Sequence, residues 1–304
     1  MREKDSPAVL EHLRAEADYA EIDQAARQRQ VGVIAAGIAG LLLANVEKGV
    51  LSSLGSVREL AFYSVAFIVA SSITMFSSAM SQSLMPAFSQ LNGSDPDNAS
   101  LRFLFSTVVR LNIIWLLPAS VFLILVAEPF FTIWAGPEFG QGSTAPFYVL
   151  LIGLSFHVIT YIPFTLLMAV GRSDLIAKIY WAELLPYLLL VWTLVAQYGA
   201  VGAAAAWSIR IIADCLILLF ATRWLTGIRL ELLPILRILL TGSILMVPGV
   251  LMFVTSLPIS AIGLVYLVFA GLYGFLLWRF VLTENEIDWL RLRVSGRSSF
   301  RFNS

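Results

Sequence analysis

The sequence predicts an all-α fold, a polytopic helical membrane protein with about eight transmembrane helices. Hydrophobic residues make up 59% of the 304 residues, and charged residues make up only 13%. Soluble domains carry roughly 25% charged residues. The apolar residues also fall into long runs that a water-soluble core does not need.

Each run has the length of a membrane-spanning helix. A helix needs about 20 apolar residues to cross the ~30 Å hydrocarbon core of a bilayer. The eight runs are approximately 31–54, 59–91, 103–127, 145–170, 175–197, 201–224, 234–255 and 259–281. The segments before and after them, residues 1–30 and 283–304, are polar and predict tails outside the bilayer. The longest outer connection is expected at about residues 128–144, where aromatic residues suit the membrane interface.

The basic residues predict the orientation. Cytoplasmic segments carry an excess of Lys and Arg. An even number of spans places both termini on one side, and a cytoplasmic N-terminus then puts 17 of the 20 basic residues at inner segments and helix ends. The exceptions are Arg58 on the outer side and Lys48 and Arg210 within spans. Both termini are therefore predicted to be cytoplasmic.

Several functional classes lack the residues they require. The formal net charge is zero, so no overall field attracts nucleic acid. The chain has one cysteine, Cys215, and two distant histidines, His12 and His157. We therefore expect no metal site, no cofactor and no catalytic residue. A membrane glycosyltransferase or ligase is disfavoured because no large outer loop is predicted.

Five stretches carry a resemblance to a known family. They are NVEKGVLSSLGSVRELAFYSVAF (Asn45–Phe67), SQSLMPAFSQL (Ser81–Leu91), FFTIWAGPEF (Phe130–Phe139), AVGRSDLIAK (Ala169–Lys178) and YGAVGAAAAWSI (Tyr198–Ile209). In this order and spacing they resemble the oligosaccharide flippase branch of the multidrug/oligosaccharidyl-lipid/polysaccharide exporter superfamily.

The resemblance implies a division of the chain. Such flippases have two six-helix lobes that face each other across a cavity. Residues 31–225 resemble the second lobe only, and residues 226–282 resemble an extra transmembrane helix pair. Residues 1–30 and 283–304 would be cytoplasmic tails. A chain that supplies the first lobe is therefore an expected partner, together with the lipid bilayer.

The resemblance also implies a function. The chain would be a transporter component that translocates lipid-linked oligosaccharide across the bacterial inner membrane, for O-antigen, capsule or exopolysaccharide biosynthesis. One alternative is a small-molecule or drug antiporter of the same superfamily. The other is a non-transporting, truncated membrane scaffold, which the missing lobe favours.

Three ionisable residues in the fifth and sixth spans are candidates for the cavity. A charged residue within a span costs about 3 kcal/mol on insertion scales and therefore needs a reason. Arg210 and Asp214 are four residues apart and share a helix face. Counting from the turn near Tyr198 places Glu183 and Asp214 within ~3 Å in depth. The open alternatives are a structural Arg210–Asp214 ion pair and a hydrated cavity in which Arg210 binds pyrophosphate.

The first and second spans add Glu47, Lys48 and Gln82 as candidates. Glu47 and Lys48 are adjacent, so their side chains diverge on a helix and do not face one partner. Lys48 could attract a pyrophosphate or pair with another helix. Gln82 lies near one face with several serines and is expected to face a cavity.

Overall fold

The computed structural model describes residue 27 and residues 30–93, 98–254 and 258–280. All regular elements in these ranges are helical, which confirms the predicted fold class. After a helical segment that begins at Gln30, they are α2 (Val46–Leu54), α3 (Val57–Ser71), η1 (Ser72–Thr74), α4 (Met75–Leu91), α5 (Ala99–Ala135), α6 (Pro137–Ala169), α7 (Ser173–Thr226), α8 (Leu232–Gly242), η2 (Ser243–Leu245), α9 (Met246–Val254) and α10 (Ile259–Phe280). Apart from Arg27 and Gln30, both predicted tails lie outside the described residues.

Seven helical stretches in the described ranges are long and apolar enough to cross a membrane. Helices suit this environment because each backbone N–H finds its acceptor within the same segment. The stretch Ser173–Thr226 has 54 residues, about twice the length that one crossing requires. It contains a break at Gly199, with φ 53° and ψ −129°. This break divides α7 into two arms, residues 173–198 and 200–226. Because each arm is long enough for one crossing, the number of crossings becomes the predicted eight.

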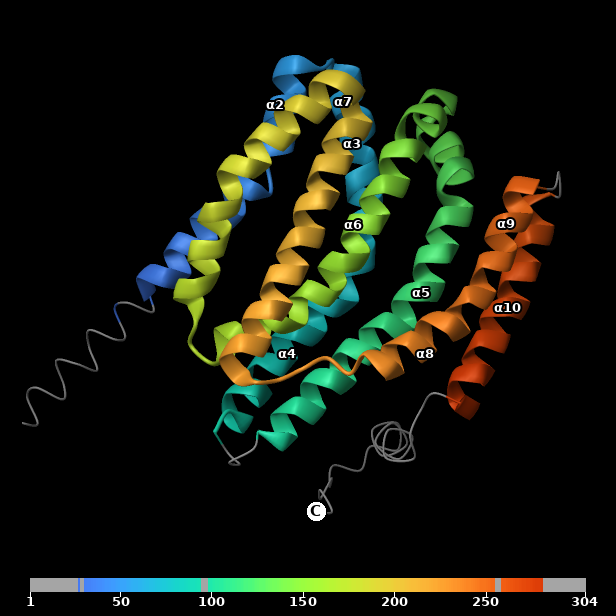
Figure 1. The fold of residues 1–304 in the computed structure, drawn as a ribbon. Coiled ribbons are helices and arrows are strands. Elements are labelled where there is room, and N and C mark those ends of the chain that lie inside the picture. The colour runs from blue at the N-terminus through green and yellow to red at the C-terminus, as the bar shows by residue number, and fades with distance from the viewer. Residues whose placement is uncertain (1–26, 28–29, 94–97, 255–257, 281–304) are drawn as a thin grey trace, which may run out of the picture.

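Gly199 allows this sharp turn because it has no side chain. Its backbone conformation is one that L-residues rarely adopt. A Cβ atom at this position would also meet the carboxylate of Glu59 near the start of α3. The two arms therefore run antiparallel, as Figure 1 shows for the yellow-green and gold parts of α7.

One sequence prediction about the connections is wrong. The expected outer loop at residues 128–144 is helical except at Gly136, where α5 ends and α6 begins. Gly136 has φ 101° and Pro137 follows at the first helical position, a combination that reverses the chain within one residue. The start of α6 lies beside the start of α3, as the ion pair between Arg58 and Glu138 shows.

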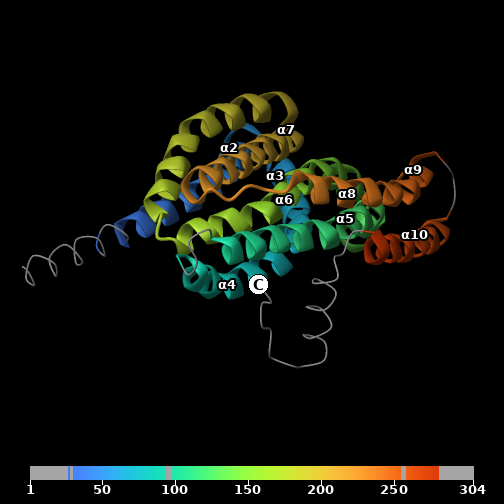
Figure 2. The same ribbon diagram turned by 60° about the horizontal axis from the view of Figure 1, so that its bottom comes forward.

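The helices form one bundle with three elements at its edge. Figures 1 and 2 both place α8, α9 and α10 beside α5, away from α2 and α7. One apolar cluster lies among α2, α3, α5, α6 and α7, and a second joins α4, α5 and α6 to the edge elements. This arrangement agrees with the predicted extra pair, but the division into a lobe and a pair stays a prediction.

A proline in α5 explains one contact at the edge. Pro118 has no N–H, so the carbonyl of Ile114 lacks its usual helical donor. Tyr273 of α10 donates a hydrogen bond to this carbonyl at 3.0 Å. Tyr266 donates to the carbonyl of Pro118 at 2.9 Å. The two hydroxyls attach α10 to the irregular part of α5.

Candidate functional site

The two arms of α7 bring three of the predicted residues together. Arg210 on the second arm lies with Nε 4.0 Å from Oε2 of Glu183 on the first arm. Each of these side chains is only 10% exposed. Asp214 lies one helical turn beyond Arg210 and is 1% exposed. One buried cation therefore lies near two buried acids.

The ion pair differs from the one that the sequence suggested. The spacing of four residues suggested a pair between Arg210 and Asp214 on one arm. In the structure the cation pairs with Glu183 of the other arm, because the antiparallel arms place this acid within reach of the long Arg210 side chain. The pair therefore links the two arms rather than two turns of one arm.

The three charged side chains leave several of their polar atoms without hydrogen bonds. Within the described ranges, neither carboxylate oxygen of Glu183 has a hydrogen-bond partner, nor do Nε of Arg210 and Oδ1 of Asp214. Most buried polar atoms in proteins have a partner, so the unsatisfied atoms of these three side chains need an explanation, and a bound ion, water or ligand is one. The arrangement is therefore suited to binding as well as to holding the arms together.

A groove of about 450 Å³ runs between the arms of α7. Glu183, Arg210 and the ring of Tyr187 line it, and its other walls are aliphatic. The guanidinium of Arg210 lies over the Tyr187 ring at 5.6 Å. The charged pair thus lies in a largely apolar groove between the two membrane-spanning arms of α7.

Glu47 is fully buried and contacts Tyr187, one of the residues that line this groove. It accepts a hydrogen bond from Tyr187 at 2.9 Å and another from Tyr63 of α3 at 3.2 Å. This three-residue contact, the Glu47 clamp, joins α2, α3 and α7. Sequence reasoning did not single out the two tyrosines. The available signal was a phenol at Tyr187, one turn after Glu183 in the same span.

The two remaining candidates lie elsewhere. Lys48 is partly exposed, and its ammonium lies 5.0 Å from the centre of the Phe67 ring. Lys48 and Glu47 therefore diverge as predicted. Gln82 is exposed on α4 and does not line the groove of α7. Glu47 itself is enclosed by its two tyrosines and does not lie on an open face.

Comparison with known proteins gives two matches. Residues 26–141 match the model of a family described as "Polysaccharide biosynthesis protein". The chain is also 32% identical over 176 residues to a Shigella flexneri protein described as a "Putative O-antigen transporter". These matches confirm the resemblance to the polysaccharide flippase family. No solved structure matches the chain.

The extent of these matches matters for the flippase resemblance. The alignment with the Shigella flexneri protein covers 57% of this chain and 40% of that protein. The family model covers Glu47, Lys48 and Gln82, whereas Glu183, Arg210 and Asp214 lie beyond its last matched residue. The assignment to the second half of a flippase stays a prediction.

Proposed function

We propose that the chain is part of a transporter that moves a lipid-linked oligosaccharide across the bacterial inner membrane during polysaccharide biosynthesis. The observation that carries the proposal is the groove of α7, in which Arg210 and Glu183 lie between aliphatic walls. A lipid-linked pyrophosphate has an apolar chain and an anionic head, so it needs both kinds of surface. The similarity to a protein described as a "Putative O-antigen transporter" supports the same class of substrate.

The charges of the groove suggest how binding could be controlled. With both carboxylates ionised, Glu183, Arg210 and Asp214 together carry one excess negative charge and would repel a pyrophosphate. Proton uptake by both acids would leave Arg210 as the net charge. A guanidinium then offers a bidentate contact to a phosphate. Proton binding and substrate binding would thus favour each other.

The transporter would require more than the described bundle. The chain spans about 40% of the length of the curated relative that it matches. In our proposal the remaining helices come from a longer reading frame or from a partner chain that supplies a first lobe. The two parts would rock about the α7 groove and give alternating access. In this arrangement the protein transports its substrate and catalyses no covalent change.

A small-molecule antiporter is the second candidate function, because two acids that share one cation also suit coupling to a proton.

The test of polysaccharide transport is complementation in a bacterium that lacks its own O-antigen transporter, with the longest reading frame that contains this chain. We expect restored surface polysaccharide, seen as a ladder on a gel. Glu183→Gln should abolish the ladder at a normal membrane level, because a neutral side chain at this position cannot lose the proton whose release would favour substrate release. The control Thr193→Val, at an exposed position on the same arm, should retain it.

The outcomes separate the candidates. A normal ladder with Arg210→Ala combined with Glu183→Gln would contradict a role of the groove in polysaccharide transport. Drug resistance without a ladder would indicate the antiporter. Neither activity from a stably inserted full-length frame would indicate a membrane scaffold.

A further inference from the structure

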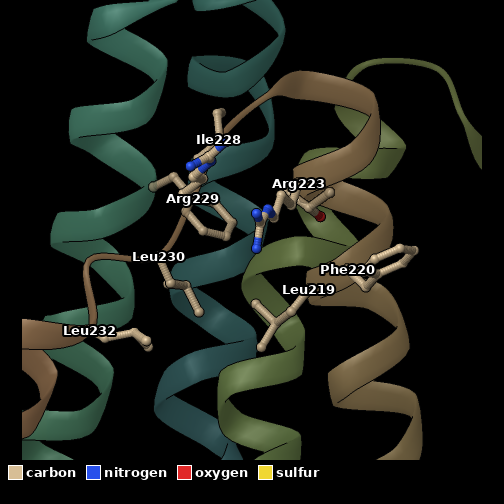
Figure 3. Close-up of a pocket in the computed structure, with 9 residues that line it drawn as sticks. Leu219, Phe220, Arg223, Ile228, Arg229, Leu230 and Leu232 are labelled. Atoms are coloured by element: carbon tan, nitrogen blue, oxygen red, sulfur yellow. The ribbon is translucent and has the colours of Figure 1, made fainter.

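A second pocket lies at the C-terminal end of α7, where its second arm ends. The segment between α7 and α8 crosses this end, and a cavity of about 380 Å³ lies beneath it. Figure 3 shows the residues that line it. Gly227, with φ 70°, ends α7 and donates its backbone N–H to the carbonyl of Arg223. Ile228 follows and is 2% exposed, so the crossing segment is anchored in the apolar core.

Two cations line this pocket. Arg223 comes from the last turn of α7 and Arg229 from the crossing segment. Among the described residues, no carboxylate lies within ion-pair distance of either guanidinium. Glu231, the nearest acid in sequence, is exposed and does not line the pocket. Two like charges beside one cavity favour an anion.

A buried hydroxyl adds an independent observation. Thr222 lines the same pocket and is 1% exposed. Its Oγ1 atom has no hydrogen-bond partner in the part of the chain that the structure describes. Such a hydroxyl can donate to a phosphate oxygen, and it would otherwise remain unsatisfied.

The remaining walls are apolar and partly open to the side. They include Phe105 of α5 and Leu219 of α7. Phe220 and Leu232 are 70% and 73% exposed at the margin. Trp224, beside the pocket in sequence, is 74% exposed, as is common for Trp at a membrane interface. The pocket thus has a charged part at Arg223 and Arg229 and an apolar side at Phe220 and Leu232 that is open to lipid.

We propose that this pocket binds an anionic phospholipid of the surrounding bilayer. Arg223 and Arg229 hold its phosphate, Thr222 donates a hydrogen bond to it, and one acyl chain lies along Phe220 and Leu232. Basic pockets between membrane helices are known to hold anionic head groups. The bound lipid would contact α5, α7 and the start of α8, whose residues line the pocket. This site is separate from the groove between the arms of α7.

The test is lipid binding by the purified full chain, measured by native mass spectrometry in a neutral detergent. Phosphatidylglycerol is compared with phosphatidylcholine of the same acyl chains at fixed salt. We expect a preference for phosphatidylglycerol, reduced about fivefold by Arg223→Gln and again by Arg229→Gln, the usual effect of one basic residue near an anionic lipid. Thr222→Val should reduce binding further without a change of charge.

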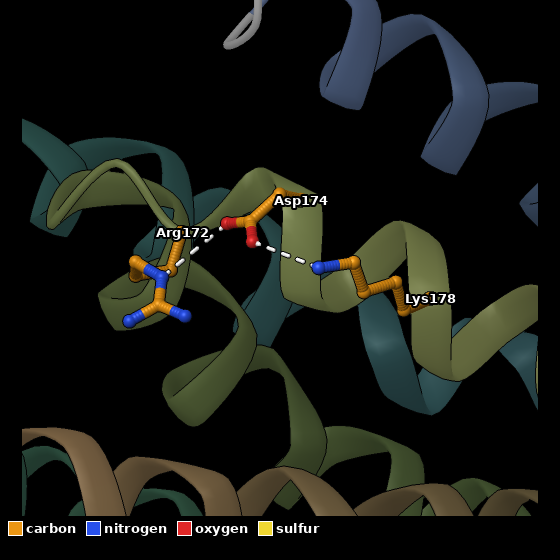
Figure 4. A network of polar contacts seen from close by, with 3 residues as sticks. All are labelled: Arg172, Asp174 and Lys178. Atoms are coloured by element: carbon orange, nitrogen blue, oxygen red, sulfur yellow. Dashed lines mark hydrogen bonds and ion pairs between the residues drawn. The ribbon is translucent and has the colours of Figure 1, made fainter.

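The control is Arg172→Gln. Arg172 lies at the same end of the bundle but outside the pocket, where it pairs with Asp174 at 3.3 Å, and Lys178 pairs with the same acid at 3.6 Å (Figure 4). This control should leave the lipid preference intact. If Arg223→Gln does not fold, Arg223→Lys keeps the charge, loses the bidentate contact and should weaken binding.

Three results would overturn the proposal. The first is an unchanged lipid preference in a folded variant that carries both glutamines. The second is equal competition by inorganic phosphate, which would indicate a free-anion site. The third is much tighter binding of a polyprenyl pyrophosphate that is lost in the same variants, which would assign the pocket to the lipid substrate of the proposed transporter.

Discussion

The Glu47 clamp makes a direct prediction about stability. Glu47, Tyr63 and Tyr187 are each at most 2% exposed. A hydrogen bond to a charged group contributes roughly 1.5–3 kcal/mol in soluble proteins, whereas polar contacts within membranes average about 0.6 kcal/mol. We therefore expect Tyr187→Phe, which removes the 2.9 Å bond, to cost about 1–2 kcal/mol. Tyr63→Phe, which removes the 3.2 Å bond, should cost less.

Glu47→Ala should cost more than either tyrosine change, about 3 kcal/mol, because it leaves two buried hydroxyls without an acceptor. The free energy of unfolding can be measured for the purified chain in mixed micelles with increasing denaturing detergent. A double-mutant cycle between Glu47→Ala and Tyr187→Phe isolates their coupling, which we expect to be about 1 kcal/mol. Tyr198→Phe is the matched control, because Tyr198 is 61% exposed and should show no effect.

A coupling near zero together with a stable Tyr187→Phe variant would contradict a stabilising role of the Glu47 clamp. This result would mean that the buried carboxylate does not join α2 to α7. Equal costs for Tyr187→Phe and the control would lead to the same conclusion.

Three further predictions follow from the α7 hairpin and the orientation. Gly199→Ala should lower the free energy of unfolding by about 2 kcal/mol or more, because the backbone at this turn is strained for any other residue. Equilibrium unfolding measures this loss, and an unchanged free energy would contradict the break at Gly199. Arg210→Ala should destabilise by roughly 3 kcal/mol, and Glu183→Gln together with Asp214→Asn in the same chain should recover most of the loss, because both uncompensated charges are removed. No recovery in the same assay would contradict a compensating role of Arg210. An impermeant thiol reagent applied to intact cells should label Glu138→Cys but not Asn92→Cys, and the reverse pattern would contradict the predicted orientation.

The groove of α7 was only partly predictable. The sequence placed Glu183 and Asp214 at one depth because the count of residues from the turn depends only on helical rise. It could not choose the partner of Arg210. Both acids were within reach by spacing, and the choice depended on how the arms rotate against each other. This rotation depends on packing between the arms, including the close approach of Gly202 on the second arm to the backbone of Leu194 on the first arm, where a Cβ on the glycine would overlap the Leu194 carbonyl oxygen.

The spans, their number and the helical fold were determined by the sequence alone. A segment in a bilayer must satisfy its own backbone, so apolar length is sufficient to predict a helix. The positions of side chains around each helix were decided by the tertiary structure. Glu47 looked like a cavity residue, but two tyrosines from distant spans enclose it. Arg223 and Arg229 looked like ordinary basic residues at a helix end, and only the packing of α5, α7 and the crossing segment places them around one pocket. Contacts between helices depend on rotation and approach, and neither is encoded in the length of an apolar run.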